Sequence, residues 1–158
     1  MLPVSNDLFL LLSVTEKKGQ KKVEDGPPAI LSGTFVFPNG DKYEGEYIQE
    51  DGSIIRSGQG VHTTTDGSVY DGEWANDKMN GNGKLSHHSG SFYTGEFVNN
   101  QFHGHGVYTW PNGSSYEGEF HENRLEGKGN FTDTENQMWT GQFRYKAAPG
   151  LQFHIRLD

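Results

Sequence analysis

The chain has 158 residues, enough for one domain or a short array of repeats. Its apolar content is 32% and its aromatic content is 13%, with 22 glycines, which is not the composition of a disordered polymer and suits a thin β structure with many turns. The formal net charge of −8 argues against nucleic-acid binding, which needs clustered basic side chains, and less strongly against binding to an anionic membrane surface.

Residues 1–30 are predicted to be a disordered lead-in, because they carry the polar stretch EKKGQKKVEDGPP; a short helix over residues 6–16 is the alternative. The apolar run at residues 8–14 is too short to span a bilayer, which takes about 20 residues, and it lacks the flanks of a secretory signal. The absence of cysteine rules out disulfides and thiolate metal sites. We therefore expect a cytoplasmic protein.

An internal repeat dominates residues 31–150. An aromatic-x-Gly-x-aromatic phrase begins at intervals of 27, 23, 23 and 23 residues, at Tyr43, Tyr70, Tyr93, Tyr116 and Trp139. A Gly-x-Gly pair follows each of the middle phrases at one fixed offset and follows the first phrase four residues late, which indicates a loop insertion there. The segment GTFVFPNG at 33–40 matches GVYTWPNG at 106–113, so about five repeats follow a leading half repeat.

Each repeat is predicted to be a β-hairpin. The phrase puts its two rings and its glycine on one face of a strand and its acidic residues on the other. Turn sequences such as Pro111-Asn112-Gly113 close the second strand, and Asn136, which replaces glycine in the last turn, also tolerates positive φ. We expect an all-β fold, a single-layer antiparallel sheet of tandem hairpins that is elongated and twisted. Roughly ten to eleven strands would make it about 50 Å long.

The Gly-x-Gly glycines share a face with neighbouring rings, so a flat ring can lie over the bare backbone and compensate for the missing side chain. One hairpin cannot bury its rings alone, whereas stacked hairpins bury one another's rings. The aromatic residues are therefore expected to be mostly structural.

Residues 151–158 are predicted to form a terminal edge strand, in which Phe153, Ile155 and Leu157 alternate with polar residues. Strict register places these three side chains on the face opposite the glycines. We favour a one-residue slip near Pro149 that returns them to the aromatic face. The alternative is an exposed apolar edge that binds another molecule.

No catalytic or cofactor site is predicted. The acidic pairs Glu44/Glu46, Asp71/Glu73 and Glu117/Glu119 recur along the array, which is typical of a solvated strand face. The Gly-x-Gly pairs are not followed by the helix that a phosphate-binding loop needs. We therefore expect a protein that is not an enzyme.

Histidines cluster in the second half of the array, at His87, His88, His103, His105 and His121. His103 and His105 have a spacing that could chelate zinc or copper. Because no third ligand is evident, we expect no metal site.

A one-layer sheet cannot cover its aromatic face completely, so ring edges could line a groove for a partner. The predicted groove consists of Tyr70, Trp74, Tyr93, Phe97, Tyr108, Trp110, Tyr116, Phe120 and Trp139. A second apolar row, which either seals the hairpin ends or touches a partner, consists of Met79, Phe102 and Leu125.

The pattern YxGEWxxxxxxGxGxxxxxxG resembles the MORN (membrane occupation and recognition nexus) repeat over about residues 33–150. This sequence departs from the pattern at the four-residue insertion, at Trp139 for tyrosine, at Asn136 for glycine, and at Gln152 for the second glycine of the last pair. The resemblance implies a twisted, open sheet with a grooved face and a scaffolding role without catalysis. It also implies association with the cytoskeleton or vesicles, with cilia or flagella, or with differentiating male germ cells.

Three functional hypotheses remain open. The first is an adaptor whose groove takes a peptide or helix, with the acidic surface favouring a basic or amphipathic segment. The second is attachment to phosphoinositide membranes, which the charge of −8 disfavours. The third is a regulatory part of a larger enzyme. Open sheet edges allow either a monomer or an edge-paired dimer.

Overall fold

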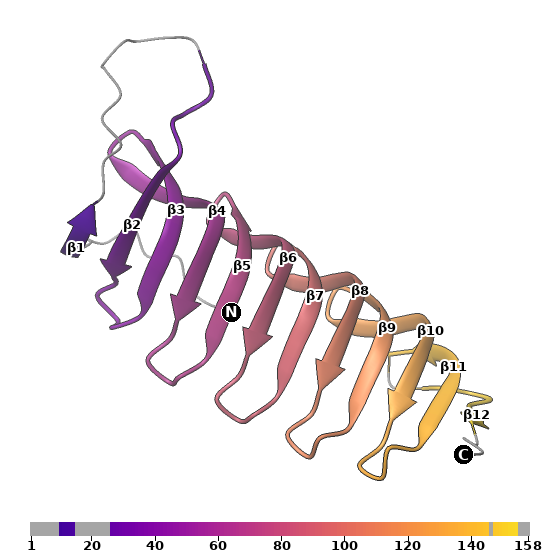
Figure 1. Ribbon diagram of the computed structural model, residues 1–158. Helices are drawn as coiled ribbons and strands as arrows, with labels where there is room; N and C mark the ends of the chain where they lie inside the picture. Colours follow the sequence, from indigo (N-terminus) through magenta and orange to yellow (C-terminus); the bar gives the residue numbers. More distant parts are fainter. Residues whose placement is uncertain (1–9, 15–25, 146, 155–158) are drawn as a thin grey trace.

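The computed structural model describes residues 10–14, 26–145 and 147–154. They form one antiparallel sheet of twelve strands in chain order, so each strand pairs with its neighbours in the sequence (Figure 1). The strands are β1 Leu10–Val14, β2 Leu31–Val36, β3 Lys42–Glu50, β4 Ser53–Thr63, β5 Val69–Ala75, β6 Lys78–Ser86, β7 Phe92–Val98, β8 Gln101–Thr109, β9 Ser115–His121, β10 Arg124–Thr132, β11 Met138–Arg144 and β12 Gln152–His154. The predicted all-β sheet of tandem hairpins is confirmed. Within these residues the structure contains no helix capable of spanning a membrane.

The lead-in is the first place where the structure departs from the prediction. Residues 10–14 form β1, which pairs antiparallel with β2, so the prediction of disorder or of a helix is wrong for these residues. Without β1, the backbone groups on one side of β2 would form an open sheet edge, and an adjacent extended segment satisfies them. The remainder of the predicted lead-in up to residue 25 lies outside the described residues.

Two kinds of turn alternate along the sheet. Four turns have a glycine with φ close to +90°, for example Gly113 at +89°, and in the fifth Asn136 takes φ +60° as expected. At the opposite end, two-residue hairpin tips carry two positive φ values, as at Asn99 (+49°) and Asn100 (+69°). Such mirror-image turns match the twist of an antiparallel pair.

Each of the hairpins β3–β4, β5–β6, β7–β8 and β9–β10 contains a β-bulge, which bends the sheet. Between β7 and β8, Gly95 pairs with Gly106 and Glu96 pairs with His103, so two residues of β8 lack opposite partners. Gly104, inside this bulge, has φ +55°. Figure 1 shows the consequence: the strands run straight from the glycine turns and bend sharply near their other ends, where the hairpin tips lie.

In three of the repeated phrases, the glutamate that follows the glycine stabilises the bulge. The backbone N–H of Gln59 donates to Glu46 Oε2 at 2.7 Å, and that of Asn82 donates to Glu73 Oε1 at 2.9 Å. Glu96 accepts from the backbone of His105 in the same way at 3.3 Å. The interpretation as a solvated strand face is therefore incomplete for these residues, because their carboxylates satisfy amides that the ladder leaves unpaired.

The core is a row of rings that lie over glycines. A Cβ atom on Gly106 would come within 2.4 Å of the Tyr93 hydroxyl oxygen, and Gly83 and Gly129 have the same relation to Tyr70 and Tyr116. The Tyr93 hydroxyl donates to the backbone oxygen of Glu96 at 3.0 Å. The expected cover of glycine by aromatic rings is confirmed.

Rings also connect one repeat with the next. The Phe97 ring makes edge-on contacts with Tyr93 in its own strand, at a centroid distance of 5.1 Å, and with Tyr70 of the preceding repeat, at 5.0 Å. Phe120 relates to Tyr116 and Tyr93 in the same way, at 5.3 and 5.0 Å. Such contacts make each repeat's stability depend on its neighbours.

Burial of these tyrosines makes the fold sensitive to alkali. Desolvation raises the pKa of Tyr116 to about 12. A raised pKa means that this tyrosine contributes stability below about pH 10, the ordinary value, and loses that contribution as the pH rises towards 12. We expect the urea concentration at the midpoint of unfolding, measured by circular dichroism, to decrease as the pH is raised from about 10 to about 12. The Tyr116→Phe variant, which has no proton to lose, should show a shallower fall. Equal slopes for the two proteins would contradict this assignment.

In the C-terminal strand β12, Phe153 shows the one-residue register slip that we favoured from the sequence. Phe153 pairs with Trp139, and the two ring centroids lie 4.8 Å apart. Strict register would have placed residue 154 opposite Trp139, so Phe153 has moved to the aromatic face. Ile155 and Leu157 lie outside the described residues.

Candidate partner-binding surface

Six of the nine residues of the predicted groove are part of the core. These residues are at most 6% exposed and cannot offer surface to a partner: Tyr70, Trp74, Tyr93, Phe97, Tyr116 and Phe120. The groove prediction is corrected for them. The physical reason is the bend at each bulge, which allows partly buried apolar side chains to pack over these rings.

The other three residues, Tyr108, Trp110 and Trp139, are partly exposed. Tyr108 and Trp110 touch at a centroid distance of 5.0 Å, and Trp110 reaches Phe131 of the next repeat at 5.9 Å. Leu85 holds the position equivalent to Tyr108 one repeat earlier. We call Leu85, Tyr108, Trp110 and Phe131 the apolar strip.

Sequence reasoning missed Leu85 and Phe131, although a signal was present. Leu85, Tyr108 and Phe131 each stand two residues after the second glycine of a Gly-x-Gly pair, at intervals of 23 residues. Each pairs with the leading aromatic residue of the next repeated phrase; Leu85, for example, lies opposite Tyr93. The repeat frame therefore places them on the aromatic face.

The second apolar row packs on the core from the hairpin-tip side. Met79, Phe102 and Leu125 lie opposite Trp74, Phe97 and Phe120, and all three are partly buried against the ring cluster. Phe102 also stacks on Tyr93 at a centroid distance of 4.0 Å. These contacts support a sealing role for the row.

The next hairpin tip holds this row in place. Asn100 Oδ1 accepts from the Met79 backbone N–H at 2.8 Å, and Asn123 Oδ1 does the same for Phe102 at 2.8 Å. The turn backbone of Asn100 also donates to the Met79 carbonyl oxygen at 3.0 Å. Adjacent repeats are thus joined at their hairpin tips, which holds the row against the core.

An open hollow of about 320 Å³ lies between the strip and the second row. Leu85 and Tyr108 contribute from the strip, Phe102 contributes from the second row, and the turn at 87–91 supplies His87, Ser89 and Ser91. The hollow is large enough for one or two side chains of a partner, and its mixed lining offers apolar contact with polar groups at one rim.

A cluster of charged residues marks the N-terminal limit of the surface formed by the apolar strip, the hollow and the second row. Arg56 stands where later repeats have Met79 or Phe102; its guanidinium lies 4.1 Å from the Trp74 ring centroid and 3.1 Å from Asp77. His62 lies 3.4 Å from Asp41 and holds the place of Leu85. Burial and the nearby Arg56 charge lower the pKa of His62 despite Asp41. The apolar surface is therefore confined to the repeats that follow.

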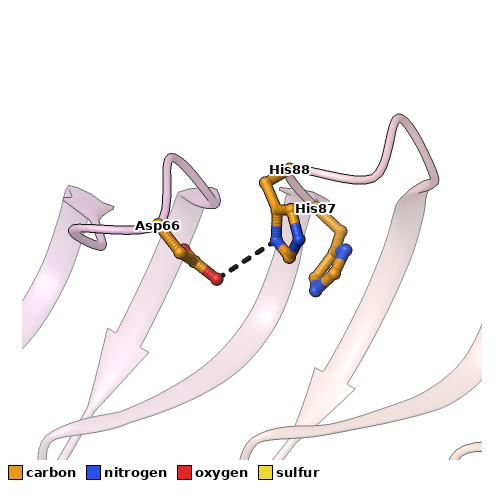
Figure 2. Close-up of side chains that lie close together, drawn as sticks. All are labelled: Asp66, His87 and His88. Carbon is orange, nitrogen blue, oxygen red and sulfur yellow. Dashed lines mark ion pairs between the residues drawn. The ribbon is translucent and has the colours of Figure 1, made fainter.

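His103 and His105, the pair whose spacing suggested chelation, have different neighbours in the structure. The His103 ring faces His121 at 5.1 Å, whereas His105 lies 3.4 Å from Glu119. Among the residues that the structure describes, the metal-ligand atoms that come together in a group of three belong to Asp66, His87 and His88, all within 4.8 Å of one another (Figure 2). Asp66 comes from the turn one repeat earlier, which is why sequence spacing did not reveal the group.

Comparison with known proteins identifies the repeat. The MORN repeat family matches residues 32–42, 55–69, 70–92, 93–115 and 116–137, together more than half of the chain. A segment of 50 residues is 44% identical to part of phosphatidylinositol 4-phosphate 5-kinase 1 of Oryza sativa subsp. japonica. That segment covers 32% of this chain and 6% of the kinase, so the likeness concerns a small part of that protein.

Proposed function

Because the chain belongs to the MORN repeat family, whose repeats are in general protein- or membrane-interaction modules, we propose that it is a non-enzymatic scaffold that binds a protein partner. The observation that carries the proposal is the hollow between the apolar strip and the second row, where Leu85, Phe102 and Tyr108 remain accessible. A continuous sheet with this surface can present the same contacts to a segment of another protein over several repeats.

The proposed occupant is an amphipathic segment, a peptide or a helix. Its apolar side chains would enter the hollow and contact Trp110 and Phe131 beside it. Its basic side chains would face a protein whose formal net charge is −8. Because the repeats stack at a regular interval, a helix with apolar residues at several turns could contact more than one repeat.

A double variant, Tyr108→Ala with Trp110→Ala, tests the surface. The partner recovered with the wild-type chain from its native cell, identified by mass spectrometry, should fall at least about tenfold with the double variant, since exposed aromatic residues dominate such interfaces. The matched control is Val107→Ala, because Val107 lies on the same strand between Gly106 and Tyr108 and points to the opposite face.

Both variants must first be shown to fold. Their melting temperatures should differ from that of the wild type only by the small amount expected for the loss of partly exposed side chains. Equal recovery of the partner by the folded double variant would refute binding at the strip. If Val107→Ala, but not the double variant, recovered less of the partner, the binding site would lie on the opposite, acidic face of the sheet.

The likeness to a lipid kinase supports a second candidate, a regulatory or membrane-tethering module. Flotation with vesicles that contain phosphatidylinositol 4-phosphate or the bisphosphate distinguishes it from the scaffold. The scaffold proposal expects the chain to stay at the bottom of the gradient. Flotation that needs the phosphoinositide would favour the second candidate.

The proposed place of action is the cytoplasm, in association with cytoskeleton, cilium or flagellum, or vesicles. Support comes from the resemblance of residues 79–158, which end in GQFRYKAAPGLQFHIRLD, to MORN repeat-containing protein 2. A role in male germ-cell differentiation is proposed on the same basis. Imaging of the tagged chain in ciliated and germ-line cells would test both statements.

A further inference from the structure

We propose that Asp66, His87 and His88 form a surface site for a divalent transition-metal ion of the zinc type. The site joins two successive glycine turns, the one at 64–68 between β4 and β5 and the one at 87–91 between β6 and β7. Figure 2 shows Asp66 and His88 reaching towards each other from these turns, with the His87 ring beside His88. Partner binding by the apolar strip does not depend on it.

The two turns are held side by side independently of any ion. The backbone N–H of His88 donates to Ser68 Oγ at 3.3 Å. Asp66 Oδ1 accepts from the Thr64 hydroxyl and, at 3.0 Å, from the Ser68 backbone N–H. These bonds orient the carboxylate so that Oδ2 lies 3.2 Å from His88 Nδ1.

That separation suits a shared ion. With bonds of about 2.0–2.1 Å, two ligands of a tetrahedral zinc ion stand about 3.3 Å apart. Asp66 Oδ2 and His88 Nδ1 therefore already span one edge of such a polyhedron, and an ion can replace the proton between them. The His87 and His88 ring centroids are 4.1 Å apart, and all three ligand atoms lie within 4.8 Å of one another, so movements of up to about 1.5 Å by exposed side chains complete the third bond.

A neighbouring group can support the His87 ring. The Ser89 backbone N–H donates to His87 Nδ1 at 3.2 Å, and Ser89 Oγ lies 2.7 Å from the same nitrogen. When Nε2 binds an ion, Nδ1 carries the ring proton, so the backbone bond is lost and Ser89 Oγ accepts that proton. A hydrogen bond to the second ring nitrogen fixes the tautomer and the orientation of a metal-binding histidine.

The donor set selects the class of ion. Two imidazoles with one carboxylate suit Zn²⁺, Co²⁺, Ni²⁺ and Cu²⁺, whereas Ca²⁺ and Mg²⁺ prefer oxygen ligands alone. The Asp66 carboxylate accepts hydrogen bonds from Thr64 and Ser68 and, like any ordinary aspartate, is ionised at neutral pH. Three protein ligands leave a fourth position for water or for a partner's side chain. His87 also lines the rim of the hollow, so the proposed site adjoins the partner surface.

The test uses the full chain without a histidine tag. Titration with Co²⁺ should produce the visible absorption of a four-coordinate ion at one equivalent, and Zn²⁺ should displace it. The variants are His87→Asn, His88→Asn and Asp66→Asn, the last of which retains Oδ1 for the turn. Each should weaken Zn²⁺ binding, measured by calorimetry, at least about tenfold.

The matched controls are His103→Asn and His105→Asn, which remove a half-buried and an exposed histidine from elsewhere on the sheet. Binding that is retained in these controls and lost in the site variants supports the proposal. Binding that is unchanged in His87→Asn and His88→Asn, binding that depends on His103 or His105, or the absence of one-equivalent binding in the folded chain would overturn it. In the last case the contact between Asp66 and His88 is an ion pair only.

Discussion

Replacing Tyr93 by alanine is expected to lower the free energy of unfolding by about 3–5 kcal/mol, the usual cost of removing a large buried ring. Tyr93 has no exposed surface and lies at the centre of the array. Its ring contacts Phe97 in its own strand, Phe102 across the hairpin and Phe120 of the next repeat, at centroid distances of 5.1, 4.0 and 5.0 Å. Removing it therefore breaks packing within one repeat and between two.

Urea denaturation followed by circular dichroism measures this effect, and two further variants identify its cause. Tyr93→Phe keeps the ring but loses the hydrogen bonds to the backbone oxygens of Glu96 and His103, so it should cost about 1 kcal/mol. Val98→Ala, on an exposed side chain of the same strand, should change stability by less than about 0.5 kcal/mol. A cost for Tyr93→Ala no larger than that for Tyr93→Phe would show that the ring is not part of the core.

The Gly106→Ala variant should be destabilised by about 3 kcal/mol, the upper part of the usual range for overpacking. Its Cβ would lie 2.4 Å from the Tyr93 hydroxyl oxygen and 2.6 Å from two ring carbons. The ring cannot retreat, because Phe102 stacks on it at 4.0 Å. The strand must therefore shift or the ring must leave its position, and either change disturbs the neighbouring repeats.

Two other glycines separate this steric effect from backbone strain. Gly26 has open space around its Cβ position and no positive φ, so Gly26→Ala should be neutral within about 0.5 kcal/mol. Gly113 also has open space but takes φ +89°, so Gly113→Ala should cost about 1–2 kcal/mol from strain alone. A Gly106→Ala cost equal to the neutral control would contradict the close contact between ring and glycine.

The ring–glycine contact also predicts strong coupling. When Gly106→Ala is made in the Tyr93→Ala background, the added methyl group meets a cavity instead of a ring, so its cost should fall well below the single-variant value. Additive costs, in contrast, would mean that the two residues do not touch. Comparison of thermal and urea unfolding shows whether the repeats still unfold as one unit.

The sequence by itself determined the repeat, the strand and turn pattern, and the pairing of consecutive hairpins. These features follow from local rules: a period of two in each phrase, glycine or asparagine wherever φ is positive, and rings opposite bare backbone. The 23-residue interval from Tyr93 to Tyr116 is sufficient to place equivalent residues on equivalent strands. The likeness in sequence to the MORN repeat led to the same architecture.

Only the tertiary structure decided which apolar residues are accessible. A period of two assigns Tyr93 and Tyr108 to the same face, but it does not show that the bulge at Gly104 bends β8 so that Phe102 covers Tyr93 and leaves Tyr108 partly exposed. Contacts between turns likewise depend on how one repeat lies on the next, which brought Asp66 to His88. Burial and long-range proximity are properties of the packed array, because each hairpin acquires them from its neighbours.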